Sequence, residues 1–205
     1  MDFDHIRQKG ERHLSDMIKD SGEISIFKDK LSQYQFKTDN KADPFSWLTC
    51  ILALKAVYKG NLGIGCILID KNSQVVTEGH NQVFKPYFRS DRHAEMVVMD
   101  EFENNYKKVS NLTGYTLYTS LESCPMCLTR LIISGITKVR HIAPDNLGGM
   151  IHQMSTMPKI WIDLAKGKSF KQADCSKELV DISNSIFLLN REELDSLIKQ
   201  RQGHQ

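Results

Sequence analysis

The 205-residue sequence carries almost no net charge, and its first twenty residues lack an uninterrupted apolar run. Its 27 Lys and Arg against 25 Asp and Glu leave a formal net charge of +2, which attracts a phosphate backbone only weakly. The charges scattered through residues 1–20 exclude a secretory signal or a membrane span there. We therefore expect a cytoplasmic protein without a membrane partner, for which nucleic acid is a less favoured partner than a small molecule.

Cysteine is also scarce, with five residues in the chain. An odd number of cysteines without a secretory signal argues against a disulfide framework, so we expect reduced thiols. Cys124 and Cys127 are separated by two residues. Such a close pair of reduced thiols indicates metal or redox chemistry.

The hydrophobic pattern predicts an α/β domain at residues 44–205, preceded by an N-terminal extension at residues 1–43 that contains helix. Asp43-Pro44 resembles a helix start, with Asp43 as the capping residue. Helical crossovers between the later strands should make them parallel, and a hairpin supplies antiparallel pairs. We therefore expect a three-layer α/β/α sandwich with a central mixed sheet. The predicted helices are 44–59, 92–106 and 125–134, and the predicted strands are 64–70, 74–79, 115–120 and 136–142.

The C-terminal part of the chain is less regular, with divergent helices from about residue 158. Ser176 and Asn190 stand where helix N-caps belong, each followed by Glu and apolar residues. His152, Trp161 and Phe170 either cover a pocket or belong to the core, and aromatic residues in such a segment more often belong to the core.

Two short motifs carry the chemistry, His93-x-Glu95 and Cys124-x-x-Cys127, each at a predicted helix start. One imidazole and two thiolates suit tetrahedral zinc with one position left for water. Zinc of this kind lowers the pKa of its bound water. Glu95 lies two residues from His93, near enough to transfer protons without binding the metal.

These motifs resemble the H-x-E and P-C-x-x-C pair of the zinc nucleobase deaminases, members of the cytidine-deaminase-like superfamily. The resemblance extends from about Pro44 to Asp145 and is closest to the branch of tRNA adenosine deaminases and guanine deaminases. It implies a cytidine-deaminase-like fold, a homodimer, and zinc held by His93, Cys124 and Cys127. Glu95 would be the catalytic acid and base.

The resemblance also implies a substrate pocket. Asn81 should hydrogen-bond the base, and the backbone at Gly65 and Cys66 should line the pocket. Ser123 stands where this branch has a proline, which removes a rigid φ and adds a backbone donor while leaving both thiolates in register. Glu122 is better explained as a carboxylate that braces a loop than as a second base.

The sequence therefore predicts a zinc-dependent hydrolase that removes an exocyclic amino group from a purine base or nucleoside such as guanine or adenine. The alternatives are a tRNA adenosine deaminase and a cytosine or cytidine deaminase. A thioredoxin-like redox site would explain the cysteine pair but not His93-x-Glu95. A deaminase-like scaffold with a closed structural zinc site would need a fourth ligand, for which Cys66 is the plausible thiol. Asn81 could also be an ordinary turn residue.

Overall fold

The computed structural model describes residues 3–18 and 22–203. The helices and strands follow one another as α1 (Asp4–Asp16), α2 (Glu23–Gln33), α3 (Asp43–Tyr58), β1 (Gly65–Ile69), β2 (Val75–His80), α4 (Ala94–Asn105), β3 (Thr116–Leu121), α5 (Pro125–Ile133), β4 (Lys138–Ala143), α6 (Lys159–Ala165), β5 (Ser169–Gln172), α7 (Lys177–Leu188) and α8 (Arg191–Arg201). Within the described ranges, no helix combines the length and the hydropathy needed to cross a bilayer.

The sheet has five strands in the order β2-β1-β3-β4-β5. β1 pairs antiparallel with β2 and with β3, whereas β3, β4 and β5 pair in parallel. The predicted mixed sheet is therefore confirmed. Strand β5 was not predicted, because Ser169–Gln172 is a short and only partly buried edge strand without a β-branched run.

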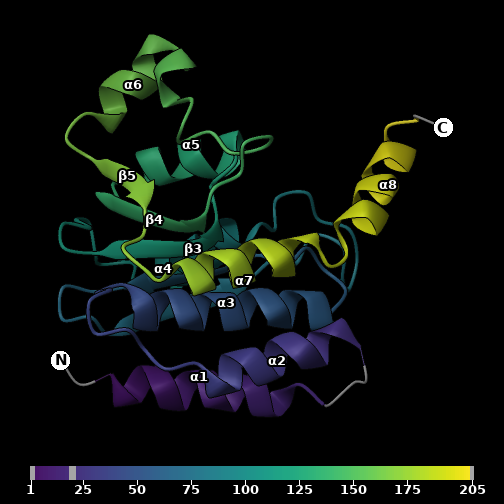
Figure 1. Cartoon of the computed structure of the whole chain (residues 1–205). Coiled ribbons are helices and arrows are strands. Elements are labelled where there is room, and N and C mark those ends of the chain that lie inside the picture. The colour runs from purple at the N-terminus through teal and green to yellow at the C-terminus, as the bar shows by residue number, and fades with distance from the viewer. Residues whose placement is uncertain (1–2, 19–21, 204–205) are drawn as a thin grey trace.

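Helices cover both faces of the sheet, as predicted for a three-layer sandwich (Figure 1). Successive residues of β1 alternate between two cores, with Ile67 and Ile69 packed toward α3 and α7. Cys66 and Leu68 point to the opposite face, where α4 and α5 pack. The N-terminal helices α1 and α2 lie on the outer side of α3, so that α3 is enclosed between them and the sheet (Figure 1).

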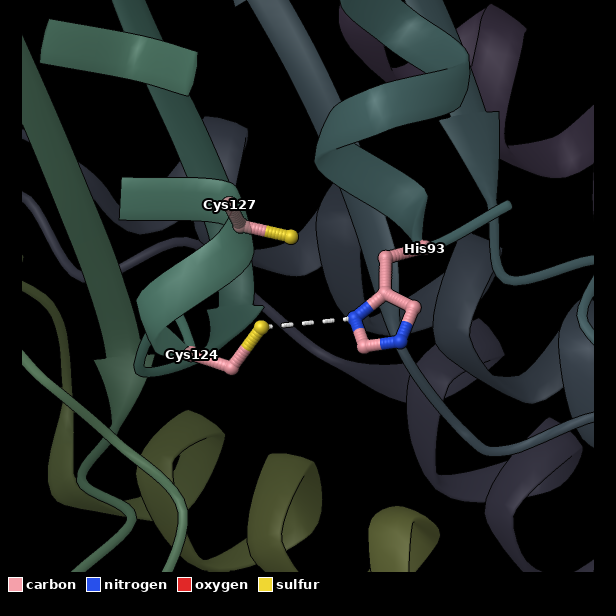
Figure 2. A group of neighbouring side chains, drawn as sticks. All are labelled: His93, Cys124 and Cys127. Atoms are coloured by element: carbon pink, nitrogen blue, oxygen red, sulfur yellow. Dashed lines mark hydrogen bonds between the residues drawn. The ribbon is translucent and has the colours of Figure 1, made fainter. Parts of the chain in front are cut away.

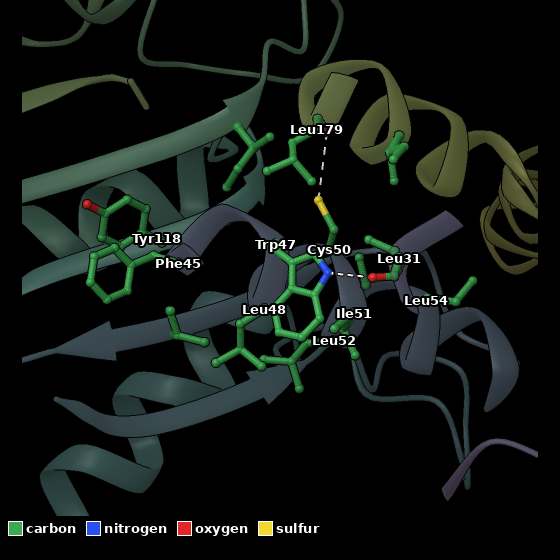
Figure 3. Packing of buried hydrophobic residues seen from close by; sticks show 14 of the residues in the cluster. Leu31, Phe45, Trp47, Leu48, Cys50, Ile51, Leu52, Leu54, Tyr118 and Leu179 are labelled. Carbon is green, nitrogen blue, oxygen red and sulfur yellow. Dashed lines mark hydrogen bonds between the residues drawn. The ribbon is translucent and has the colours of Figure 1, made fainter. Parts of the chain in front are cut away.

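Helix α3 carries apolar residues on most of its circumference, which is typical of a helix that is covered on every side. Trp47, near the N-terminal end of α3, has no exposed surface, and its indole N–H donates to the carbonyl of Leu31 in α2 at 2.7 Å (Figure 3). Helix α1 approaches the same ring at Gly10, where a Cβ would lie 2.3 Å from the indole. The N-terminal extension therefore shares one hydrophobic core with the sheet domain.

The predicted role of Asp43 as a helix cap is wrong. Helix α3 begins at Asp43 itself, and the Asp43 carboxylate is completely buried. It accepts hydrogen bonds from the Tyr34 hydroxyl at 2.5 Å, the Ser176 amide at 2.7 Å and the Lys37 amide at 2.8 Å. The carboxylate thus accepts hydrogen bonds from two other segments of the chain instead of from the first amides of α3. Asp43 thereby joins the N-terminal extension to the start of α7.

The two predicted C-terminal caps have different outcomes. Ser176 caps α7, since its hydroxyl accepts from the Leu179 amide at 3.3 Å. Asn190 occupies the N-cap position of α8 but makes no capping hydrogen bond with its side chain. Its Nδ2 instead donates to the Asn61 carbonyl at 2.7 Å, in the segment between α3 and β1.

Ion pairs attach α1 to the edge strand β2. Glu78 contacts His13 Nε2 at 2.7 Å and Lys9 Nζ at 3.2 Å. Burial raises the pKa of Glu78, but the hydrogen bond and charge of His13, together with Lys9, outweigh it and leave the pKa below its ordinary value. Docking of α1 on β2 is therefore favoured by the ionised carboxylate.

Candidate metal and active site

The N-termini of α4 and α5 bring the predicted metal-binding side chains together. His93 is the N-cap residue of α4, Cys124 is the N-cap residue of α5, and Cys127 lies in the first turn of α5. Their donor atoms all lie within 4.8 Å of one another, and Cys124 Sγ is 3.5 Å from His93 Nδ1. Figure 2 shows the imidazole and both sulfurs directed toward the same point. Three side chains from two separate motifs thus form one candidate metal site.

The electrostatics of this group favour a cation. The hydrogen bond from the Cys127 thiol, together with the adjacent His93 ring, lowers the pKa of Cys124 to about 4 despite its burial. Cys124 is consequently a thiolate at neutral pH. A thiolate, a second thiol and an imidazole at two helix N-termini are the donors that zinc takes in its tetrahedral sites. The residues present therefore fit zinc.

Cys66 is not a member of this group. It is completely buried beneath α4, packed with Ala94 and Val98. Burial and the nearby Glu95 carboxylate raise the pKa of its thiol well above the ordinary value. Among the residues that the structure describes, three side chains form the group of metal donors. The fourth position of a tetrahedral site is therefore left without a protein ligand.

Glu95 lies in the first turn of α4, two residues after His93, and its side chain is buried. Burial and the neighbouring Cys124 raise its pKa above the ordinary value. Its Oε1 accepts a hydrogen bond from the Ser123 hydroxyl at 2.8 Å. A buried carboxyl group with a raised pKa beside the metal donors is suited to accept and return a proton.

Asn81 follows β2 and is completely buried. Its Oδ1 accepts from the Val83 amide at 3.1 Å, which is the turn role that Asn often takes. Its Nδ2 has no hydrogen-bond partner among the described residues. The loop that begins here closes where the Gln82 amide donates to the Arg92 carbonyl at 2.9 Å, next to His93. Asn81 therefore combines a structural oxygen with an unused buried donor near the candidate site.

Gly65 begins β1, and its amide donates to the Ser120 hydroxyl at 3.0 Å. A Cβ on Gly65 would lie 2.3 Å from the Thr49 carbonyl oxygen of α3. Glycine is therefore needed at this position for the close approach of β1 to α3. This packing requirement is independent of the expected backbone contact with a substrate.

Glu122 braces a loop, as predicted. One of its oxygens accepts from the His152 amide and from His152 Nδ1, both at 2.8 Å, and the other accepts from the Asp145 amide at 3.2 Å. Trp161 and Phe170 are partly buried and pack against the cluster around α5 and α6 that contains Leu128. His152 holds the loop after β4 through Glu122.

Sequence reasoning missed the contribution of the Ser123 side chain. From the sequence, Ser123 differed from proline only in its backbone properties. In the structure its hydroxyl contacts the carboxylate that the sequence assigned to proton transfer. A hydroxyl side chain immediately before the first cysteine was the available signal, but only the folded backbone could show that it points toward α4.

Comparison with known proteins decides the family. The sequence profile of the cytidine and deoxycytidylate deaminase zinc-binding region matches residues 42–143. This segment is a zinc-binding deaminase region. It spans α3 to β4, and so it contains all three candidate metal donors and Glu95. Zinc is the cofactor of this region.

Relatives in sequence match about half of this chain. The tRNA-specific adenosine deaminase of Bacillus subtilis is 39% identical over 97 residues, which are 47% of this chain and 58% of that protein. A probable cytosine deaminase of Schizosaccharomyces pombe is 28% identical over 106 residues, 51% of this chain and 62% of the relative. This chain therefore matches about three fifths of the length of either relative.

Solved structures share the fold. A tRNA:A34 deaminase that carries out A-to-I editing at the wobble position superposes with a TM-score of 0.56 and 20% identity, covering 67% of this chain and 94% of the other. The guanine deaminase of Nitrosomonas europaea has the same TM-score at 14% identity, covering 75% and 88%. At this identity the likeness establishes the cytidine-deaminase-like fold, which the sequence predicted.

Proposed function

We propose that the protein is a hydrolytic deaminase that removes an exocyclic amino group from a purine base or nucleoside. The observation that carries this proposal is the convergence of His93, Cys124 and Cys127 beside the buried carboxyl group of Glu95. The deaminase family of the region supports the reaction type. In the reaction, the oxygen of water replaces the amino group on the ring carbon, and the amino group leaves as ammonia.

His93, Cys124 and Cys127 would hold the zinc ion. Zinc bound there would supply Lewis-acid activation of water near neutral pH. The three side chains leave one coordination position for a ligand that is not part of the protein. A closed structural site would need a fourth protein donor, and Cys66 does not lie in the group.

Glu95 would move the protons. Its buried carboxylate takes a proton from the attacking water and delivers it to the ring nitrogen next to the reacting carbon. It then transfers the second proton of the water to the departing amino group, which leaves as ammonia. A raised pKa suits both steps, because a carboxyl group with a pKa closer to neutrality both accepts and releases a proton readily.

Asn81 would contact the ring. Its Oδ1 is engaged by the Val83 amide, so the group it offers to a ligand is the Nδ2 donor. A purine presents ring nitrogens and, in guanine, a carbonyl oxygen as acceptors for such a donor. A bound purine would therefore satisfy a buried amide hydrogen that the protein leaves unpaired.

A second candidate is the same reaction on adenosine within tRNA. The observation in its favour is that several relatives in sequence, from 26% to 39% identical, are tRNA-specific adenosine deaminases. Against it, the formal net charge of +2 provides little general attraction for RNA. The helices α1, α2 and α6 to α8 lie outside the region that the family profile matches, and they could shape a different entrance to the site.

Ammonia release from purified protein tests the proposal and separates the two candidates. The panel contains guanine, adenine, their nucleosides, cytosine, cytidine and unmodified tRNA, and Glu95→Gln protein serves as the control for contaminating enzymes. Turnover of a purine base or nucleoside that is lost in the control supports the main proposal. Turnover of tRNA alone favours the second candidate. Lack of turnover of every compound by zinc-loaded protein would contradict both.

A further inference from the structure

We propose that Ser123 is a positioning residue that orients the Glu95 carboxylate for proton transfer. The inference rests on the proposed deaminase function of this site and adds a residue to its machinery. It starts from one contact, the hydrogen bond of 2.8 Å that the Ser123 hydroxyl donates to Glu95 Oε1. Proline, which the resembling deaminases have at this position, could not make that contact.

Both partners of this hydrogen bond are shielded from water. Ser123 is completely buried, and Glu95 is 4% exposed. A hydrogen bond to a charged acceptor is stronger than one between neutral groups, and removing one partner leaves the other unpaired in a medium that cannot replace it. The hydroxyl of Ser123 is thus an important determinant of the direction in which the carboxylate points.

The backbone around Ser123 holds this hydroxyl in place. The Glu122 amide donates to the Ala143 carbonyl at 2.9 Å and so extends the parallel pairing of β3 with β4 by one residue. The Ser123 carbonyl accepts from the Met150 amide at 2.9 Å. Glu122 itself is held by the His152 and Asp145 amides. The sheet and the loop after β4 therefore fix residue 123 from both sides.

This arrangement gives the two carboxylate oxygens different roles. The hydrogen bond from Ser123 engages Oε1, which leaves proton exchange with the water and the substrate to Oε2. Because residue 123 immediately precedes Cys124, one short segment positions both a metal donor and the partner of the proton carrier. The distance between the metal site and Oε2 is consequently set by the same backbone.

The experiment compares two pairs of proteins. The first pair is Ser123→Ala and the natural protein, and the second pair is Ser123→Val and Ser123→Thr. In each pair, one protein has a hydroxyl group at residue 123 and the other lacks it. Ser183→Ala is the control, because it removes an equally buried hydroxyl that donates to the Ser120 carbonyl at 2.6 Å and is not a contact of Glu95. With the best substrate of the panel, Ser123→Ala should lower kcat about tenfold or more, the effect of a lost hydrogen bond to a charged group.

A residue that merely supports the fold would behave differently. We expect Ser123→Ala to keep the zinc content and the KM of the natural protein. The kcat of Ser123→Thr should be higher than that of Ser123→Val. The control Ser183→Ala should keep the natural kcat. In a Glu95→Gln background the effect of Ser123→Ala on the residual kcat should nearly vanish, because the carboxylate that Ser123 positions is gone. An unchanged kcat in Ser123→Ala, loss of zinc, or an equal effect in the Glu95→Gln background would each overturn the proposal.

Thermal unfolding of the same proteins makes the test independent of activity. If the hydrogen bond couples the two residues, the shifts in unfolding midpoint of Ser123→Ala and Glu95→Gln will not add up to that of the double variant. Additive shifts would overturn the proposal. Coupled shifts in a protein that releases no ammonia from any compound would refute the proposed function while upholding the contact between Ser123 and Glu95.

Discussion

Replacing Asn81 by alanine tests substrate recognition directly. The change removes the unpaired Nδ2 donor and also the Oδ1 atom that accepts from the Val83 amide. Loss of a buried partner costs about 1–3 kcal/mol, so kcat/KM should fall by roughly 5- to 150-fold if Nδ2 contacts the transition state. The unpaired Val83 amide should lower the free energy of unfolding by about 1 kcal/mol.

The Asn81→Asp variant separates these two effects. A carboxylate keeps an oxygen that can accept from the Val83 amide, but it has no N–H to donate. The turn should therefore be retained, while kcat/KM should fall at least as far as in Asn81→Ala, because a negative oxygen would face an acceptor of the ring. Zinc content should be unchanged in both variants, since Asn81 lies outside the group of metal donors.

The assay is ammonia release under steady-state conditions, with zinc content and unfolding midpoint measured on the same preparations. The best substrate of the panel gives kcat/KM, which reports the interactions gained in the transition state. If both variants bind zinc normally and retain the natural kcat/KM, Asn81 is only a turn residue and the recognition argument is refuted. A loss of unfolding free energy without a change in kcat/KM would lead to the same conclusion.

Three further predictions concern the metal, the proton carrier and pH. Metal analysis should find one zinc per chain in the natural protein and none in Cys124→Ala or Cys127→Ala. Cys66→Ala should keep its zinc, and loss of zinc from this variant would indicate a structural site with four protein ligands. Glu95→Gln should bind zinc and fold normally but lose at least about 100-fold in kcat, because an amide of the same shape cannot carry the proton; near-normal turnover would remove Glu95 from the mechanism. Because its pKa is lowered in the folded protein, ionised Glu78 stabilises the docking of α1 above the ordinary glutamate pKa, and this contribution is lost as pH falls through the lowered value. The difference in unfolding midpoint between natural and Glu78→Gln protein should thus be largest near pH 6 and shrink as the pH falls below the ordinary glutamate pKa. A constant difference would contradict the sign of the shift.

Much of the fold followed from local patterns in the sequence. The hairpin and the helical crossovers predicted a mixed sheet, and the strand pairing has that form. The helix starts predicted at His93-x-Glu95 and at Cys124-x-x-Cys127 agree with the first residues of α4 and α5 to within two residues. Strand β5 was missed because an edge strand with polar residues is stabilised by its pairing with β4 rather than by its own composition.

The sequence by itself predicted the family of residues 42–143 and the candidate metal donors, because donor type and spacing at two helix starts are typical of a zinc-binding deaminase region. Only the tertiary structure decided which polar groups face one another. Asp43 accepts a hydrogen bond from the Ser176 amide, 133 residues further along the chain, and Ser123 reaches Glu95 across 28 residues. Such contacts depend on how helices and strands pack, and a buried polar group takes whichever partner that packing places within reach.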